Sequence, residues 1–189
     1  LFLTELLYFR IANKYNIIDK PNERSSHNYI TIRGGGIIWW VAALLYVLFN
    51  PSEMSGWFLT GITLMAGISL WDDVKGLGQK VRLLAQLVAM TCAFILAGAF
   101  GMYPWWAIAL GYIVFIGIVN AYNFMDGING ITGLYSIAVL ASLQYVNLSY
   151  GNFVQPDLIW YPMIASAVFL FFNFRKRARC FAGDVGSVT

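Results

Sequence analysis

Long apolar stretches alternate with short polar connections along the whole chain. The apolar start, Leu1–Ile11, has the pattern of the end of a truncated span. Further apolar runs cover Gly36–Pro51, Gly56–Trp71, Leu83–Phe100, Trp105–Val119, Ile131–Leu148 and Leu158–Phe174. Their lengths are close to, or a little short of, the roughly 20 residues that a helix needs to cross a bilayer core. They lack the polar–apolar alternation of barrel strands. The pattern predicts an all-α, polytopic transmembrane helical bundle with about seven spans, the first of them truncated.

The polar connections are of two kinds, and the two kinds alternate. One kind has neither Lys nor Arg and comprises Asn50–Ser55, Gly101–Pro104 and Ser149–Asp157. The other kind holds all the Lys and Arg residues except Arg10, which borders it, and comprises Asn13–Gly35, Asp72–Arg82, Asn120–Gly130 and Arg175–Thr189. By the positive-inside rule, the basic connections face the cytoplasm.

Composition supports a membrane protein and excludes a water-soluble one. Only 11% of the residues are charged, against about 25% in soluble domains, and 59% are hydrophobic. The net charge of +3 is explained by basic residues that flank the spans, so no nucleic-acid partner is expected. Cys92 and Cys180 are expected at different depths and therefore unpaired. The chain begins without Met and ends soon after a Gly/Asp/Ser cluster. We interpret residues 1–189 as one integral-membrane domain that is incomplete at both ends.

Two adjacent acids, Asp72 and Asp73, follow the apolar run Gly56–Trp71. Neighbouring carboxylates repel each other, and their desolvation near a membrane is costly, so a divalent cation or a nearby lysine is expected to relieve them. The alternative is a helix end with two solvated acids that pair with Lys75 or Lys80.

A run of amides, one carboxylate and glycines covers Asn120–Gly133. Asn120, Asn123 and Asp126 recur every three residues and would share one helix face, and glycines then permit close backbone approach to a ligand. Amides beside a carboxylate suit a pyrophosphate held with a divalent cation. Polar contacts between helices with small-residue packing are the alternative.

Two further clusters complete the set. In Phe181–Ser187, Asp184 between glycines fits a Mg²⁺ ligand in a loop. Asp19–His27 is followed by Arg33–Gly36, where the arginine and the glycine N–H groups can bind phosphate oxygens, although the glycines also fit a tight entry into the next helix. Together the clusters indicate phosphoryl transfer from a soluble nucleotide to a membrane-dissolved acceptor.

These motifs resemble the polyprenyl-phosphate N-acetylhexosamine-1-phosphate transferase superfamily, glycosyltransferase family 4. The matching stretches are Asp19–His27 with Arg33–Gly36, Asp72-Asp73, Asn120–Gly133 and Gly183–Ser187. The first stretch is most similar to the branch that initiates O-antigen synthesis, the undecaprenyl-phosphate N-acetylglucosamine-1-phosphate transferases. The resemblance implies a bacterial inner-membrane enzyme with its active site on the cytoplasmic side. It would transfer a sugar-1-phosphate from a UDP-N-acetylhexosamine to undecaprenyl phosphate and release UMP.

The resemblance also implies roles for individual residues. Asp184 would bind Mg²⁺, for which Mn²⁺ can substitute. Asp72 and Asp73 would lie beside the lipid phosphate, with Asp72 deprotonating or orienting it, and Asp126 would support the end of the Asn-rich helix. Arg33 would bind phosphate. The nucleotide-sugar would be bound by Asn120, Asn123, Gly127, Ile128, Asn129 and Phe181, with Phe181 stacking on the uracil.

The sequence departs from the family pattern in two respects, and it leaves several alternatives for mechanism and function open. Gly76 stands where the family often has a third acid, and a late histidine-rich motif is absent from these residues. The lipid phosphate can attack the β-phosphorus directly, or Asp72 can act as a nucleophile that forms a covalent intermediate. A transporter with a cytoplasmic-side polar site is the competing function class. A non-catalytic scaffold would leave the Asn120–Gly133 run unexplained.

Overall fold

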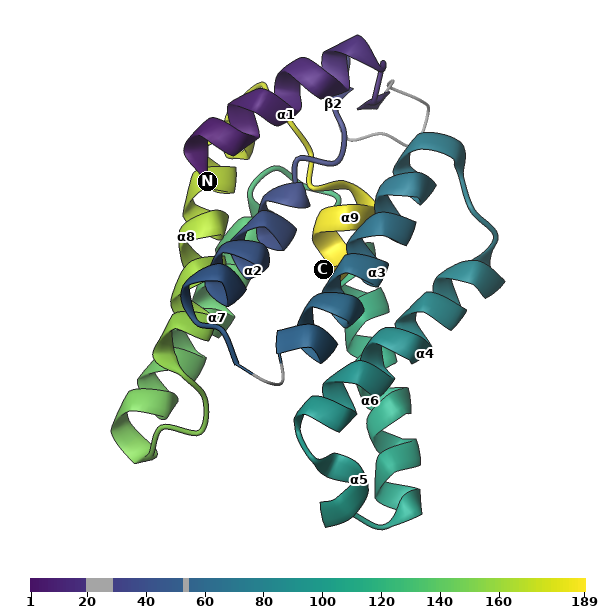
Figure 1. Cartoon of the computed structure of the whole chain (residues 1–189). Coiled ribbons are helices and arrows are strands. Elements are labelled where there is room, and N and C mark those ends of the chain that lie inside the picture. Colours follow the sequence, from purple (N-terminus) through teal and green to yellow (C-terminus); the bar gives the residue numbers. More distant parts are fainter. Residues whose placement is uncertain (20–28, 53–54) are drawn as a thin grey trace.

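The computed structural model describes residues 1–19, 29–52 and 55–189, and these residues are mostly helical (Figure 1). The stretch 20–28, which carries most of the Asp19–His27 motif, lies outside them. The described elements are α1 (Phe2–Lys14), β1 (Ile18–Asp19), β2 (Thr31–Ile32), α2 (Ile37–Phe49), α3 (Ser55–Lys75), α4 (Gln79–Leu96), α5 (Ala99–Met102), α6 (Trp105–Met125), α7 (Ile131–Tyr150), α8 (Pro156–Asn173) and α9 (Gly183–Val188).

Every apolar run of the sequence forms a helix, so the all-α prediction is confirmed. Three helices of the described chain are long and apolar enough to cross a membrane, namely α4, α6 and α7, and α2 is a shorter apolar helix. Helix α6 has no fully buried side chain, and many of its apolar side chains are exposed. An apolar helix that is exposed in this way is stable where lipid covers it. The chain is therefore a polytopic membrane protein, and the full number of spans stays a prediction.

The structure differs from the expected pattern at two places that matter for the site. Helix α6 continues past the apolar run to Met125, so the first amides of the Asn-rich run stand on its last turns. Residues Gly183–Val188 form the short helix α9, where a loop was expected. In addition, β1 and β2 pair antiparallel, and Ile32 of β2 bridges to Cys180. That bridge brings the segment after α8 against the segment that enters α2.

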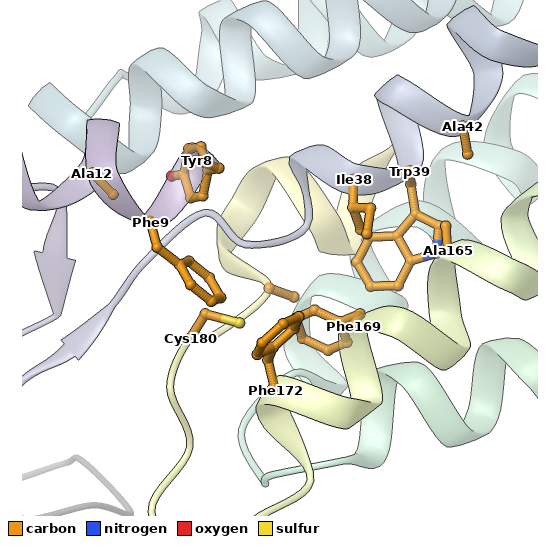
Figure 2. Packing of buried hydrophobic residues seen from close by; sticks show 11 residues of the cluster. Tyr8, Phe9, Ala12, Ile38, Trp39, Ala42, Ala165, Phe169, Phe172 and Cys180 are labelled. Atoms are coloured by element: carbon orange, nitrogen blue, oxygen red, sulfur yellow. The ribbon is translucent and has the colours of Figure 1, made fainter. Parts of the chain in front are cut away.

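Buried side chains from α1, α2, α8 and the segment before α9 form the main core (Figure 2). Phe9, Phe172 and Phe169 pack there with Ile38, and the Trp39 indole N–H donates to Ser166 Oγ at 2.9 Å. Both cysteines are buried and free, as predicted. A smaller cluster joins α3, α4 and the end of α9. Helix α9 lies between α2 and α3 (Figure 1) and also contacts α6.

Candidate active site

Asp184, in the first turn of α9, lies at the centre of a cluster of charged and amide side chains. Its Oδ1 accepts a hydrogen bond from Asn123 Nδ2 at 2.7 Å. Its Oδ2 lies 3.5 Å from Arg33 Nη2 and 3.8 Å from Arg82 Nη1. Burial would raise the pKa of Asp184, but the hydrogen bonds from Asn123 and Asp72 and the two guanidinium groups outweigh it, so the pKa lies below its usual range. The carboxylate is therefore charged at neutral pH.

Asp72 pairs with Arg82, and not with Lys75 or Lys80. Its Oδ2 lies 3.1 Å from Arg82 Nη1, and its Oδ1 accepts the Leu77 backbone N–H. The local chain explains this pairing. Gly76, at φ +69°, ends α3 with a left-handed turn, so the chain folds back over Asp72 and begins α4 at Gln79. Arg82 then stands in the first turn of α4 and faces the end of α3.

Arg82 is a site residue that the sequence did not single out. Besides Asp72 and Asp184, it contacts Asn123, whose Oδ1 lies 3.4 Å from Arg82 Nη2. One guanidinium therefore joins α3, α4, α6 and α9. Nothing near Arg82 in the sequence distinguishes it from a basic residue that only sets membrane orientation, because its partners are distant in the chain.

Asp73 contacts different groups from Asp72, and it holds the start of α9 in place. Its side chain is fully buried, Arg33 Nε lies 2.7 Å from its Oδ1, and its two oxygens accept the backbone N–H groups of Asp184 (2.9 Å) and Val185 (3.1 Å). Burial raises the pKa of Asp73 to about 6. The carboxylate satisfies N–H groups that open the first turn of α9, which explains why a glycine-containing segment is helical there.

The glycines at the entry to α2 serve close packing against α9. A Cβ on Gly36 would overlap the Cα of Gly186, and one on Gly183 would lie 2.8 Å from the Gly34 nitrogen. The N–H groups of Gly35 and Gly36 donate to the carbonyls of Phe181 (2.9 Å) and Ala182 (3.0 Å). These two N–H groups are therefore already bonded, which corrects the idea that they bind phosphate. Arg33 is the part of this motif that reaches the cluster.

The amides of the Asn-rich run have different surroundings. Asn123 Nδ2 also lies 2.7 Å from Ser187 Oγ, so it fastens α6 to α9. Asn120, one turn earlier, donates to Gln86 Oε1 at 3.1 Å and joins α6 to α4. Asn120 does not contact the acidic cluster. Its hydrogen bond to Gln86 is a polar contact between two helices, as the alternative interpretation of the Asn-rich run expected. Asp126 accepts the Thr132 hydroxyl at 2.5 Å, which ties the end of α6 to the start of α7, and burial raises its pKa.

Asn173 joins the two segments that were expected to bind the nucleotide, the turn after α6 and the segment before Phe181. The sequence analysis did not single out this residue. Gly127 and Ile128 are exposed, and Phe181 is half-buried. Buried Asn173, at the end of α8, accepts the Gly130 N–H at 2.6 Å and donates to the Cys180 carbonyl at 2.8 Å. Asn129 donates to the Arg175 carbonyl at 3.0 Å. The turn after α6 and the segment that leads to Phe181 are therefore held together.

The carboxyl groups of Asp72 and Asp184 suit a divalent cation that also has a phosphate ligand. The two groups are within hydrogen-bonding reach of each other. No group of three or more His, Cys, Asp and Glu side chains in the described part of the chain could hold a metal ion. Mg²⁺ commonly uses only one or two carboxylates and takes its other ligands from phosphates and water. Asp72 and Asp184 could therefore serve as the carboxylate ligands of such an ion.

The fold and this cluster define a helical membrane protein with an acidic site bridged by arginines. The chain belongs to glycosyl transferase family 4, whose family model matches residues 55–189. It is 29% identical, over 95% of its length and 54% of the relative's, to the probable undecaprenyl-phosphate N-acetylglucosaminyl 1-phosphate transferase of Bacillus subtilis. It is 32% identical, over 84% of its length and 52% of the relative's, to the undecaprenyl-phosphate alpha-N-acetylglucosaminyl 1-phosphate transferase of Thermotoga maritima. The chain spans about half the length of these relatives.

Proposed function

We propose that the protein transfers an N-acetylhexosamine-1-phosphate from a UDP-sugar to undecaprenyl phosphate. The products would be UMP and an undecaprenyl-diphosphate-sugar, which begins a cell-envelope polysaccharide such as O-antigen. The observation that carries the proposal is the convergence of Asp184, Asn123, Asp72 and Arg82 from α9, α6, α3 and α4. The names of the relatives support this acceptor and this class of sugar. A transporter is less well supported, because these polar groups meet at one end of the bundle.

A divalent cation is part of the proposal. The side chains of Asp72, Asp73 and Asp184 face two guanidinium groups, so the ionised cluster carries one more negative than positive charge. Asp184 and Asp72 would hold Mg²⁺ or Mn²⁺. When bound, the ion would neutralise the pyrophosphate and stabilise the leaving UMP.

The surrounding residues would bind and orient the two substrates. Arg33 and Arg82 supply donors for phosphate oxygens, and Asn123 fixes the position of Asp184. Asp126 would maintain the turn between α6 and α7 through Thr132. The turn residues Gly127, Ile128 and Asn129 would line the uracil pocket, with the Phe181 ring stacked on the base.

The chemical step we propose is direct in-line displacement. An oxygen of undecaprenyl phosphate attacks the β-phosphorus of the UDP-sugar, and the bond from that phosphorus to the bridging oxygen breaks to release UMP. Asp72 would orient the lipid phosphate or take its proton. The alternative is that Asp72, whose oxygens contact Arg82 and the Leu77 N–H, acts as a nucleophile and forms a covalent intermediate. Rapid-quench labelling with a UDP-sugar in the absence of lipid distinguishes them, because a phosphosugar–protein adduct would exclude direct attack.

We place the site at the cytoplasmic surface of the bacterial inner membrane. The connections that carry the basic residues also carry Arg33, Asp72, Arg82 and Asp184. Positively charged connections face the cytoplasm. The soluble UDP-sugar would then reach the site from the same compartment.

The function is tested by product formation. Membranes that contain the full-length protein are incubated with undecaprenyl phosphate and each of several UDP-N-acetylhexosamines, and UMP and the lipid product are measured together. We expect one donor to give both products in equal amounts, and chelation of divalent cations to abolish them. Lipid-independent hydrolysis of every donor, or no UMP from any donor, would refute the proposal.

Arg82→Gln is expected to lower kcat/KM by about 100-fold, since it leaves Asp72, Asn123 and Asp184 without their common donor. Arg82→Lys keeps the charge but cannot bridge several groups at once, so we expect an intermediate loss. The measurement is the rate of UMP release across donor concentrations. Lys75→Gln is the matched control, because exposed Lys75 lies over the Trp71 ring and away from the acids. Equal losses in Arg82→Gln and Lys75→Gln would contradict a specific role.

A further inference from the structure

Six cationic side chains lie on two elements that contact each other, α1 and the segment after α8. All six are exposed, and we call them the basic face: Arg10, Lys14, Arg175, Lys176, Arg177 and Arg179. Contacts between the two elements hold them together. The Arg179 guanidinium lies 5.8 Å from the Phe9 ring centroid of α1 and 5.9 Å from that of Phe172. The Phe2 ring lies 5.6 Å from Phe171. Helix α1 thus lies beside the end of α8 (Figure 1).

The charges of the basic face are not balanced within the described part of the protein. Ion pairs between residues in this part involve Arg33 and Arg82, and none of the six cations has a carboxylate partner there. Membrane orientation explains why basic residues lie on this side. It does not explain why two elements from distant parts of the chain, both rich in cations, pack against each other, because like charges on neighbouring elements repel each other unless an anion binds between them.

Apolar side chains adjoin the basic face on both of its elements. Leu3, Leu7 and Ile11 form an outward stripe on α1 and are 79%, 55% and 43% exposed. Arg10 and Lys14 follow on the last turns of the same helix. On α8, exposed Phe171 lies 4.7 Å below the Arg175 guanidinium. Apolar side chains followed by cations match the boundary between acyl chains and headgroups, where long basic side chains reach toward the phosphates.

We propose that the basic face binds the headgroups of anionic phospholipids, with the apolar stripe of α1 and Phe171 against their acyl chains. The ligand is a lipid and not a free phosphate ion, because a free ion would gain nothing from the exposed leucines and phenylalanine beside the cations. This surface is separate from the arginines of the acidic cluster, since none of its six cations contacts Asp72, Asp73 or Asp184. The inference stands whether or not the transfer reaction is as proposed.

The test is lipid selectivity of the full-length protein in phosphatidylcholine vesicles that contain a few per cent of spin-labelled lipid. The fraction of motionally restricted label is compared for phosphatidylglycerol and phosphatidylcholine. We expect a several-fold preference for phosphatidylglycerol that weakens as salt is raised. Because cations near an anionic surface favour anionic lipid, Arg10→Gln/Lys14→Gln and Lys176→Gln/Arg177→Gln should each reduce the preference, and the quadruple variant should abolish it. Arg179 is kept, because its stacking on Phe9 and Phe172 supports the fold.

The matched control is Lys75→Gln/Lys80→Gln, which removes two exposed cations from another basic connection. It should keep the wild-type preference, and all variants should keep the wild-type unfolding temperature. A quadruple variant that retains the preference would overturn the proposal, and so would a control that loses it equally. Inorganic phosphate that competes more strongly than chloride at equal ionic strength would identify a free-phosphate site instead. If the quadruple variant fails to fold, the two double variants decide by the same criterion.

Discussion

Replacing Asp184 with Asn is expected to lower the kcat of sugar-phosphate transfer by about 1,000-fold while the protein remains folded. Asn keeps the shape and one acceptor oxygen, so the contact with Asn123 can persist. It removes the charge that the depressed pKa of Asp184 maintains at neutral pH, and with it the carboxylate proposed to hold the divalent cation. The residual activity should require a higher Mg²⁺ concentration for half-saturation than the wild type.

UMP release over a Mg²⁺ titration measures both effects in one experiment. Asp157→Asn is the matched control, because it makes the same chemical change at an exposed acid in the first turn of α8, at the opposite end of that helix from Asn173. The control should behave as the wild type. Unchanged Mg²⁺ dependence and unchanged kcat in Asp184→Asn would remove this residue from the metal site and leave the mechanism without its central carboxylate.

Gly36→Ala is expected to lower the free energy of unfolding by about 3 kcal/mol and to abolish transfer. The added Cβ would overlap the backbone of Gly186, and backbone atoms cannot rotate away as the end of a side chain can. Helices α2 and α9 would have to separate. That movement would draw Asp184 away from Arg33 and Asn123.

Thermal unfolding in detergent, followed by the accessibility of the buried cysteines, measures the loss of stability. Gly67→Ala in α3 is the matched control, since a Cβ there meets no atom within 4 Å. We expect it to be neutral or to stabilise the helix by about 1 kcal/mol or less. Similar unfolding temperatures for Gly36→Ala and the wild type would show that α2 and α9 can separate at little cost.

The sequence predicted the helices well, because apolar runs of near-spanning length have few other solutions in a bilayer. It predicted their ends less well. Asn120 and Asn123 were expected beyond the apolar run Trp105–Val119, and they stand on α6 itself. Gln86 and Asp184, which lie far away in the chain, bond these amides and stabilise the extended helix.

The acidic and amide members of the site were recognisable because several such residues occur together, as in Asp72-Asp73 and the Asn-rich run. Arg82 and Asn173 were not recognisable, because each is a single polar residue whose partners come from other helices. Helix α9 was missed for a related reason. Two glycines among six residues indicate a loop, and only the carboxylate of Asp73, more than a hundred residues earlier, makes the helical turn stable.

Asp73 is made long before α9, whose first N–H groups its carboxylate accepts. The ribosome completes α1 to α8 before it reaches Gly183, and until then the oxygens of Asp73 lack the N–H groups that α9 supplies. A nascent chain at this stage has α1 to α8 but not the acidic cluster around Asp184. The cluster therefore forms only after α8 has been made, when α9 packs between helices that were synthesised earlier.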